Sequence, residues 1–255
     1  MDKVLHAVFG SWDQILSGLG YTILATVLGA LLALILAFIL GLGSRARNVV
    51  VRGVVRAVVE FFRGTSLFVQ LFWFYYAMPE LGFGFAPVQI GSFIIPSGVF
   101  AGVVAFGLNF GAYGAEVVRG AINAVPKAQW EGATALNMSP FQRMRLVILP
   151  QAWVGMIPPF NNLLIQLLKS TPLLSLVLVA DLTAVFQQIR DDTANTLATF
   201  FVLMLIYFVI AYVFTLLMNA LETVASAKLG RGRGLRAVFR IRAADTSVDI
   251  GKGVR

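Results

Sequence analysis

The sequence contains no cysteine and few charged residues, and both shortages limit what the chain can be. Without cysteine it can form no disulfide, no thiol nucleophile and no zinc–thiolate site. Charged residues make up 13% of its 255 residues, whereas a typical soluble protein has about 25%. Hydrophobic residues make up 58%, and the mean hydropathy is +0.83. So little charge is typical of a protein that lies in a lipid bilayer.

The chain also lacks the pattern that binds nucleotide phosphates, Gly-x-x-x-x-Gly-Lys-Ser/Thr. Its nearest fragment, Gly251-Lys252-Gly253, has neither the upstream glycine nor the hydroxyl after the lysine. His6 is the single histidine, and no Ser/His/acid catalytic set is evident. We therefore expect a chain that is not an enzyme, holds no cofactor or metal, and neither binds nor hydrolyses ATP.

Long windows without a charged residue are what the sequence has in abundance. They cover residues 14–44, 81–115, 146–168 and 193–221, and a shorter one covers 64–79. A spanning helix needs roughly 20 apolar residues. The windows predict an all-α polytopic membrane protein with about five transmembrane helices.

The net charge of +8 follows these windows along the chain. Of the 20 Lys and Arg, four lie in 45–56 after the first span, four in 119–145 after the third, and eight in the tail 228–255. Only Lys3 and Arg190 fall in segments that we place outside. This is the positive-inside pattern for an outside N-terminus and an inside C-terminus. It explains the basic charge without a nucleic-acid partner.

The same pattern divides the chain into a membrane domain and a tail. We expect the membrane domain to cover 1–224, with a cytoplasmic loop at about 119–150. The tail, 225–255, is basic and predicted to be disordered. Residues 45–56 alternate arginines with valines and predict an amphipathic helix at the cytoplasmic interface, whereas 181–196 predict an outside loop.

Polar residues near the second span have two interpretations. Glu60 and Arg63 lie three residues apart, so they could form a neutral pair on one face of a helix. Alternatively, Arg63 and Gln70 help to form a translocation path or its gate.

A polar stripe in the third span, predicted at about 95–118, also has two interpretations. Asn109, Tyr113 and Glu116 are four and three residues apart, which places them on one helical face. Polar residues in lipid normally face protein or a water-filled path. The stripe is either a hydrogen-bond network between helices, with Glu116 paired to Arg119, or part of a solute path.

The fourth span has an interruption at Lys169-Ser170-Thr171-Pro172, and Pro158-Pro159 predict where its helix starts. A break at membrane depth is tolerated where it is buried or lines a cavity. Lys169 is therefore the strongest candidate for a functional charge inside the membrane. The alternative is a lysine near the interface, or one paired with an acidic residue of a neighbouring span.

A polar, basic insert at 129–150 separates the third and fourth spans. Its Glu131-Gly132-Ala133 and its closing Ile148-Leu149-Pro150 resemble the "EAA" loop of ATP-binding-cassette (ABC) importer permeases. Further segments between 60 and 189 resemble the polar amino acid branch of that family in the same order. They are Glu60-Phe61-Phe62-Arg63-Gly64-Thr65 with Val69-Gln70-Leu71, Ala112-Tyr113, Glu116 with Arg119-Gly120-Ala121-Ile122, Val125-Pro126-Lys127, Pro150-Gln151-Ala152, Pro158-Pro159, Leu167-Leu168-Lys169-Ser170-Thr171 and Asp181-Leu182-Thr183.

The loop departs from the family pattern at two positions. Gly132 replaces the usual alanine, and Asn137 replaces a glycine. Asparagine tolerates the left-handed conformation better than most residues, so a helix–turn–helix at Leu136–Ser139 is retained. The spelling Ala135-Leu136-Asn137 is similar to a branch associated with ectoine and hydroxyectoine uptake.

The resemblance implies a type I ABC importer transmembrane domain in the bacterial inner membrane, moving a polar amino acid or a similar small zwitterion. It also implies four partners: an ABC ATPase dimer that uses ATP and Mg²⁺, a second permease subunit, an extracytoplasmic solute-binding protein and the lipid bilayer. A short helix starting near Glu131 would insert its apolar side into a groove on the ATPase. The implied coupling residues are Glu131, Gly132, Ala133, Leu136, Asn137, Arg143, Arg145 and Pro150, with Met138 on the apolar side.

A secondary transporter driven by an ion gradient is the alternative from another class. Such transporters commonly contain inverted repeats. We find no internal repeat, and five spans do not divide into two equal halves.

Overall fold

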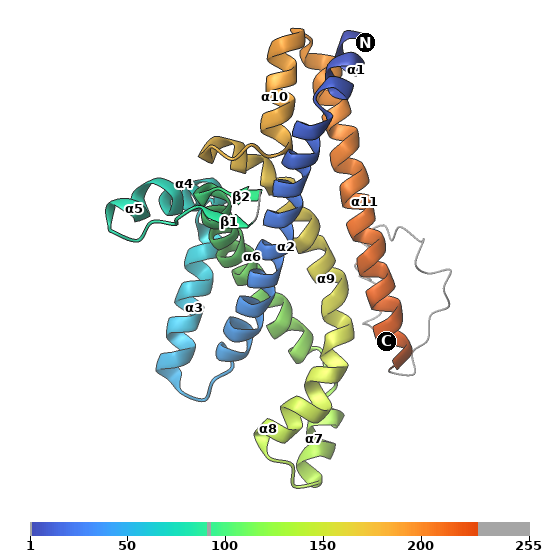
Figure 1. Ribbon diagram of the computed structural model, residues 1–255. Helices are drawn as coiled ribbons and strands as arrows, with labels where there is room; N and C mark the ends of the chain where they lie inside the picture. Colours follow the sequence, from blue (N-terminus) through green and yellow to red (C-terminus); the bar gives the residue numbers. More distant parts are fainter. Residues whose placement is uncertain (1, 91–92, 229–255) are drawn as a thin grey trace, which may run out of the picture.

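The structure is a computed structural model that describes residues 2–90 and 93–228 (Figure 1). Within these residues three helices are long and apolar enough to cross a membrane alone: α2 (Trp12–Gly43), α6 (Ser97–Asn123) and α11 (Thr196–Lys228). Two bent pairs add to them. Val49–Gly64 meets Leu67–Glu80 at 101°, and Pro140–Val177 meets Leu182–Thr193 at 61°. Counting each bent pair as one span gives five, as predicted.

α2 and α6 form the central pair of the fold, and small residues let them approach closely. A Cβ added to Gly41 would lie 2.7 Å from Cβ of Val118 and 2.9 Å from the carbonyl oxygen of Ala115. A Cβ on Gly114 would lie 2.6 Å from Cβ of Ala37. Contacts this close between apolar helices are typical of small-residue packing in membranes.

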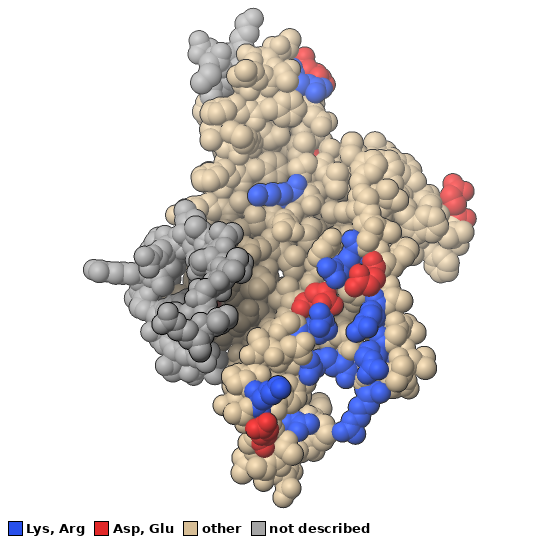
Figure 2. All heavy atoms as spheres, turned by 180° about the vertical axis from the view of Figure 1, so that it is seen from behind, with Lys and Arg blue, Asp and Glu red and all other residues tan. Residues whose placement is uncertain are grey.

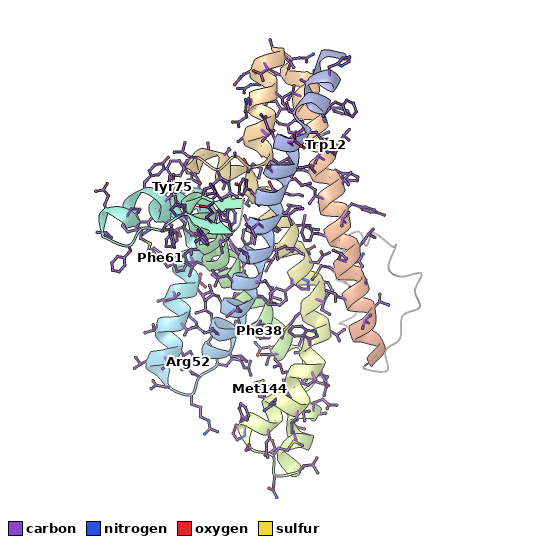
Figure 3. The ribbon with its side chains drawn as sticks, in the orientation of Figure 1. Trp12, Phe38, Arg52, Phe61, Tyr75 and Met144 are labelled. Carbon is purple, nitrogen blue, oxygen red and sulfur yellow. The ribbon has the colours of Figure 1, made fainter. Side chains whose placement is uncertain are left out.

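α9 packs against the same pair. Phe38 of α2 stacks on Trp153 and Phe160 of α9, with ring centroids 5.5 Å and 6.3 Å apart (Figure 3). α6 is the most enclosed of the long helices, whereas α11 covers the outside and leaves most of its surface open. The helix that carries the polar stripe is therefore at the centre of the molecule.

Much of the basic segment 45–56 is helical, as predicted, but the helix is longer than that segment. α3 (Val49–Gly64) begins after Asn48, continues to Gly64 and runs alongside α2 (Figure 1). Asn48 caps it by accepting a hydrogen bond from the Val50 amide at 2.9 Å. The chain then turns sharply into α4 (Leu67–Phe72), the π-helical segment η1 (Trp73–Ala77) and α5 (Met78–Glu80).

A short hairpin follows α5 and was not predicted. β1 (Val88–Ile90) pairs antiparallel with β2 (Phe93–Ile95). The hydroxyl of Tyr21 on α2 donates to the carbonyl of Ile94 at 2.7 Å and fixes the hairpin against the helices.

The cytoplasmic loop contains α7 (Lys127–Ala135), α8 (Pro140–Gln142) and the π-helical segment η2 (Arg143–Ile148). It leads into α9 (Leu149–Ser170). Pro158 and Pro159 lie inside α9 and not at its start, so that prediction was wrong. Proline is tolerated within a membrane helix because neighbouring groups can satisfy the few backbone groups that it frees.

A 3₁₀ segment, η3 (Thr171–Val177), follows α9 and confirms the predicted interruption. The chain then enters α10 (Leu182–Thr193), which replaces the loop predicted over 181–196. Asp181 caps α10, because its carboxylate accepts from the amides of Thr183 at 3.2 Å and Ala184 at 3.0 Å. Asp181 itself is buried at the start of this helix. The residues predicted to form a solvated turn, Arg190-Asp191-Asp192, lie in the last turns of α10.

The two ends of the molecule differ in what they carry. α1 (Asp2–Gly10) and α10 lie at one end, and α7 and α8 lie at the other (Figure 1). α11 continues to Lys228, four residues into the predicted tail, and the rest of that tail lies outside the described residues.

Candidate functional site

The cytoplasmic loop is folded by its own backbone bonds into a helical hairpin. Asn137 has a φ of 54°, which confirms the left-handed turn predicted for it. The turn is closed by hydrogen bonds from the Asn137 amide to the Thr134 carbonyl at 2.9 Å and from the Met138 amide to the Ala133 carbonyl at 3.1 Å. Ser139 and Gln142 then form a reciprocal capping box that starts α8.

Two of the predicted coupling residues face the interior of this hairpin. α7 begins at Lys127, one turn before Glu131, so its buried face differs from the predicted one. Ala133 is only 4% exposed. The Arg143 guanidinium donates to the Thr134 hydroxyl at 2.6 Å and lies over the Trp130 ring. Ala133 and Arg143 hold the hairpin together and do not form its outer surface.

The outer surface combines exposed apolar and charged side chains. Leu136 is 73% exposed, and Phe141, which the sequence did not single out, is 70% exposed. The remaining predicted residues of this surface are also exposed: Glu131, Gly132, Asn137, Arg145 and Pro150. We call Glu131, Leu136, Phe141 and Arg145 the coupling surface. Phe141 could have been found from the sequence, because Ser139-Pro140-Phe141-Gln142 has the pattern of a capping box at the start of a helix.

The corner between α3 and α4, residues 62–66, collects most of the predicted pathway residues. Gln70 of α4 donates to the carbonyl of Phe62 at 3.0 Å and to the Thr65 hydroxyl at 2.7 Å. Asn109 of α6 donates to the same Phe62 carbonyl at 3.0 Å. Both amide side chains are buried. They satisfy carbonyls at the end of α3 that a continuing helix would have satisfied.

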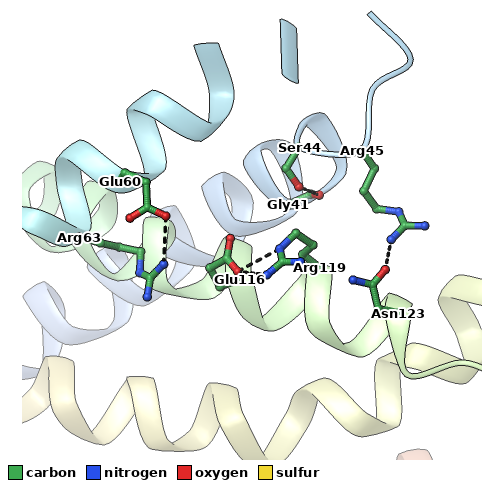
Figure 4. Close-up of polar contacts among 8 residues, drawn as sticks. All are labelled: Gly41, Ser44, Arg45, Glu60, Arg63, Glu116, Arg119 and Asn123. Atoms are coloured by element: carbon green, nitrogen blue, oxygen red, sulfur yellow. Dashed lines mark hydrogen bonds and ion pairs between the residues drawn. The ribbon is translucent and has the colours of Figure 1, made fainter. Parts of the chain in front are cut away.

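Tyr113 contacts the same corner, and the charged residues Glu60, Arg63, Glu116 and Arg119 lie near it (Figure 4). The Tyr113 hydroxyl donates to the Arg63 carbonyl at 3.3 Å, and the Arg63 guanidinium lies 5.3 Å from the Tyr113 ring centroid. Arg63 pairs with Glu60 at 3.6 Å, and Arg119 Nε donates to Glu116 at 2.9 Å. The hydrogen-bond network and both pairings named as alternatives are therefore present.

Lys169 stands apart from this corner. It is exposed at the end of α9, immediately before η3, and within the described parts of the chain no hydrogen bond or ion pair holds its ammonium group. The break beside it contains Leu178, which has a φ of 58°. Left-handed backbone in a non-glycine residue occurs mainly where surrounding structure imposes it. The pairing of Lys169 with an acidic residue, one of its two alternatives, is not seen.

Basic side chains gather on the lower half of the molecule in Figure 2, near the cytoplasmic loop. Arg45 connects that region to the loop, because its guanidinium donates to the side-chain oxygen of Asn123 and lies over the Trp130 ring. Burial, and then the nearby charge of Arg119, lower the pKa of Arg45. An arginine remains charged at neutral pH nevertheless. In the region that the structure describes, no group of three His, Cys, Asp or Glu could hold a metal ion.

Comparison with known proteins gives consistent relatives. Residues 29–225 match the family described as "Binding-protein-dependent transport system inner membrane component". The chain is 40% identical over 226 residues to the probable amino-acid ABC transporter permease protein y4tF of Sinorhizobium fredii, covering 87% of this chain and 93% of that protein. It is 34% identical over 212 residues to the L-cystine transport system permease protein TcyB of Bacillus subtilis, covering 83% and 86%.

A solved structure has the same fold. The crystal structure of an amino acid ABC transporter with histidines superimposes with a TM-score of 0.72 at 29% identity, covering 84% of this chain and 95% of that one. An inward-facing MetNI methionine ABC transporter superimposes with a TM-score of 0.69 at 19% identity, covering 85% and 98%, and supports the fold alone.

Proposed function

This chain belongs to the family of binding-protein-dependent transport system inner membrane components, and from that membership we propose that it carries a polar amino acid or a similar small zwitterion. It is a multi-pass permease subunit of the inner membrane and not an enzyme. A separate ATPase subunit and a solute-binding protein work with it. The amino acid class is supported by the names of its relatives, which include permeases for amino acids and cystine.

The single observation that carries the coupling role is the exposure of two large apolar side chains on a polar, aqueous loop. Leu136 and Phe141 are among the most exposed large apolar side chains of the described residues. Burying each in a partner would contribute roughly 1.5–3 kcal/mol. We propose that both side chains enter a groove on the ATPase, while Glu131 and Arg145 make polar contacts at its rim and Gly132 lets the backbone come close.

The subunits of the complex and the place where ATP binds are also part of the proposal. The ATPase is a dimer, and ATP and Mg²⁺ are bound there and not by this chain. A second permease subunit, either a copy or a relative, faces this one. Closure of the ATPase dimer then changes the populations of outward- and inward-facing states, because ATP binds the closed dimer more tightly.

The solute path is proposed from charge and exposure. Lys169 offers an unshared ammonium group beside a break in the membrane, where a solute carboxylate can approach it. Arg63, Tyr113 and Glu116 are partly exposed at the corner and form a second place of contact. The hydrogen bonds of Gln70 and Asn109 favour a structural role for these two.

Reconstitution tests this function directly. The chain is placed in proteoliposomes with its own ATPase and binding protein, and uptake of labelled histidine, glutamine, cystine and ectoine is measured with ATP inside. We expect ATP-dependent uptake of an amino acid that the binding protein also binds. Uptake of ectoine alone would show that the transported solute is this compatible solute and not an amino acid. Uptake that follows an imposed ion gradient without ATP would contradict the proposed mechanism and favour a secondary transporter.

A further inference from the structure

Trp130 of α7 contacts two arginines that come from separate elements. The guanidinium of Arg45, in the connection between α2 and α3, lies 5.5 Å from the centroid of the indole ring. The guanidinium of Arg143, the first residue of η2, also lies 5.5 Å from it. A cation within about 6 Å of an aromatic centroid is attracted by the ring, and tryptophan attracts it most strongly. We call Arg45, Trp130 and Arg143 the Trp130 cluster.

Hydrogen bonds hold both arginines of the cluster in place. Arg45 donates to the side-chain oxygen of Asn123, the last residue of α6. Arg143 donates to the Thr134 hydroxyl at 2.6 Å, and that hydroxyl donates to the Trp130 carbonyl at 2.8 Å. The cluster therefore joins the α2–α3 connection, the end of α6, α7 and η2 at one aromatic ring.

The contact with Arg45 differs from the others in sequence separation. Along the chain α7 is connected to α6 on one side and, through α8, to η2 and α9 on the other. Arg45 is more than one whole span away from Trp130 along the chain. It lies in the connection that joins the lower ends of α2 and α3 (Figure 1). A displacement of α7 reaches α6 and α9 through covalent connections, but it reaches α2 and α3 here through a contact.

We propose that the Trp130 cluster transmits the movement of α7 to the lower ends of α2 and α3, so that Trp130 is a positioning residue of the transport cycle. The proposal rests on the coupling role proposed above for the loop. An aromatic ring suits this position because its face is broad and uncharged. Two guanidinium groups can each lie against it, and the attraction of the ring for a cation does not depend on one fixed hydrogen-bond geometry.

The test compares Trp130→Leu with Trp130→Phe in the reconstituted complex, measuring solute transported per ATP hydrolysed. We expect Trp130→Leu to lower this ratio about fivefold, the combined weight of two cation–π contacts at solvent-exposed sites. Trp130→Phe keeps an aromatic face and should remain within about twofold of the original protein. Trp12→Leu, the same change on an exposed tryptophan of α2, is the matched control and should leave the ratio unchanged.

A second variant addresses the individual contact. Arg45→Gln alone should lower the ratio of solute transported to ATP hydrolysed. In a protein that already has Trp130→Leu, it should lower that ratio no further. A ratio for Trp130→Leu equal to that of the original protein would overturn the proposal, and so would full additivity of the two changes. Loss of the ATPase from the purified complex with both Trp130 variants would also overturn it, because Trp130 would then act in docking.

The absence of cysteine allows the movement itself to be measured. Spin labels at Arg47→Cys and Lys127→Cys report the distance between the α2–α3 connection and α7 during ATP binding. We expect this distance to stay nearly constant in the original protein and to change once Trp130 is Leu. A constant distance in both would overturn the linkage. The proposed function fails separately, when the original complex shows no ATP-driven uptake at all.

Discussion

The cytoplasmic hairpin and the corner between α3 and α4 use polar residues in opposite ways. In the hairpin, Ser139 and Gln142 bond to each other and Arg143 donates to Thr134, while Leu136 and Phe141 are exposed. In the corner, Gln70 and Asn109 are buried and donate to backbone carbonyls. Polarity in a loop therefore frees apolar residues for a partner, whereas polarity in a span repairs the backbone.

This difference changes how a polar residue in a membrane helix is interpreted. Asn109 looked like a candidate for a water-filled path because an amide is expensive in lipid. The break in α3 gives it another use, since a helix that ends at membrane depth leaves carbonyls without donors. Lys169 is exposed and, among the residues that the structure describes, has no hydrogen-bond or ion-pair partner, so it is the stronger pathway candidate.

The largest effect is expected at the coupling surface. Glu131→Lys reverses an exposed charge that has no part in the hydrogen bonds of the hairpin, so the hairpin should still fold. We expect ATP-driven uptake in the reconstituted complex to fall to background while the ATPase continues to hydrolyse ATP. Glu80→Lys, the same reversal on α5, is the control. Normal uptake by Glu131→Lys would contradict the coupling role proposed for the hairpin, and the hairpin would then differ from the corner in structure alone.

Substitutions in the corner between α3 and α4 should lower the stability of the protein and leave its affinity for the solute unchanged. Gln70→Leu and Asn109→Leu each remove one of two donors to the Phe62 carbonyl. Asn109→Leu should cost about 1 kcal/mol, and Gln70→Leu about 1.5 kcal/mol because Gln70 also donates to the Thr65 hydroxyl. The double variant should cost more than their sum, about 3 kcal/mol, because the carbonyl then has no donor from either side chain. Unfolding in a titration with SDS measures this cost, with Gln14→Leu on an exposed glutamine as control.

Transport kinetics of the same variants decide between the two interpretations of the corner. A raised KM for the solute with unchanged stability would make Gln70 and Asn109 pathway residues. A double variant whose loss equals the sum of the two single losses would show that the two donors do not act on one shared acceptor.

The α2–α6 contact beneath the corner should be nearly as sensitive. Gly41→Ala places a methyl group 2.7 Å from Cβ of Val118 and 2.9 Å from a backbone oxygen. Because neither neighbour is the end of a flexible side chain, we expect a loss of about 2 kcal/mol. Gly20→Ala lies on the same helix with open space around it and serves as the matched control. Equal stability of the two variants in the same titration would contradict the close approach of the helices.

The smallest effect is expected at the turn of the hairpin. Asn137→Ala keeps the chain length but places alanine at a φ of 54°, which should cost about 1 kcal/mol locally. Asn137→Gly should leave the turn at least as stable as it is in the original protein. Hydrogen exchange of the amides of Asn137 and Met138 measures the local opening. Faster exchange with glycine than with alanine would show that the left-handed turn does not control the hairpin.

The sequence predicted the features that depend on local pattern and charge. The charge-free windows located the helices, and Asn137 was assigned to its left-handed turn because few other residues tolerate one. The interruption after Lys169 was visible from Pro172. Each of these depends on neighbours within a few residues.

The errors concern features that depend on distant partners. Ala133 was placed on the outer surface because the start of α7 was set at Glu131 and not at Lys127. Residues 182–193 were predicted as a loop because the charged run Arg190-Asp191-Asp192 suggested a solvated turn, and the capping role of Asp181 at the start of α10 was not recognised. The link from Trp130 to Arg45 spans more than 80 positions, and no local pattern indicates it.

The length of α2 gives the lipid a part in the mechanism. Its 32 residues extend about 48 Å at 1.5 Å per residue, whereas the hydrocarbon core of a bilayer is about 30 Å thick. Apolar residues are exposed along much of it, among them Ile23, Leu31 and Ile39. Such a helix must tilt or thicken the bilayer around it, and its tilt is fixed by its packing against α6. Any state that tilts the α2–α6 pair differently meets a different hydrophobic mismatch, so the acyl chain length of the membrane sets part of the balance between transport states.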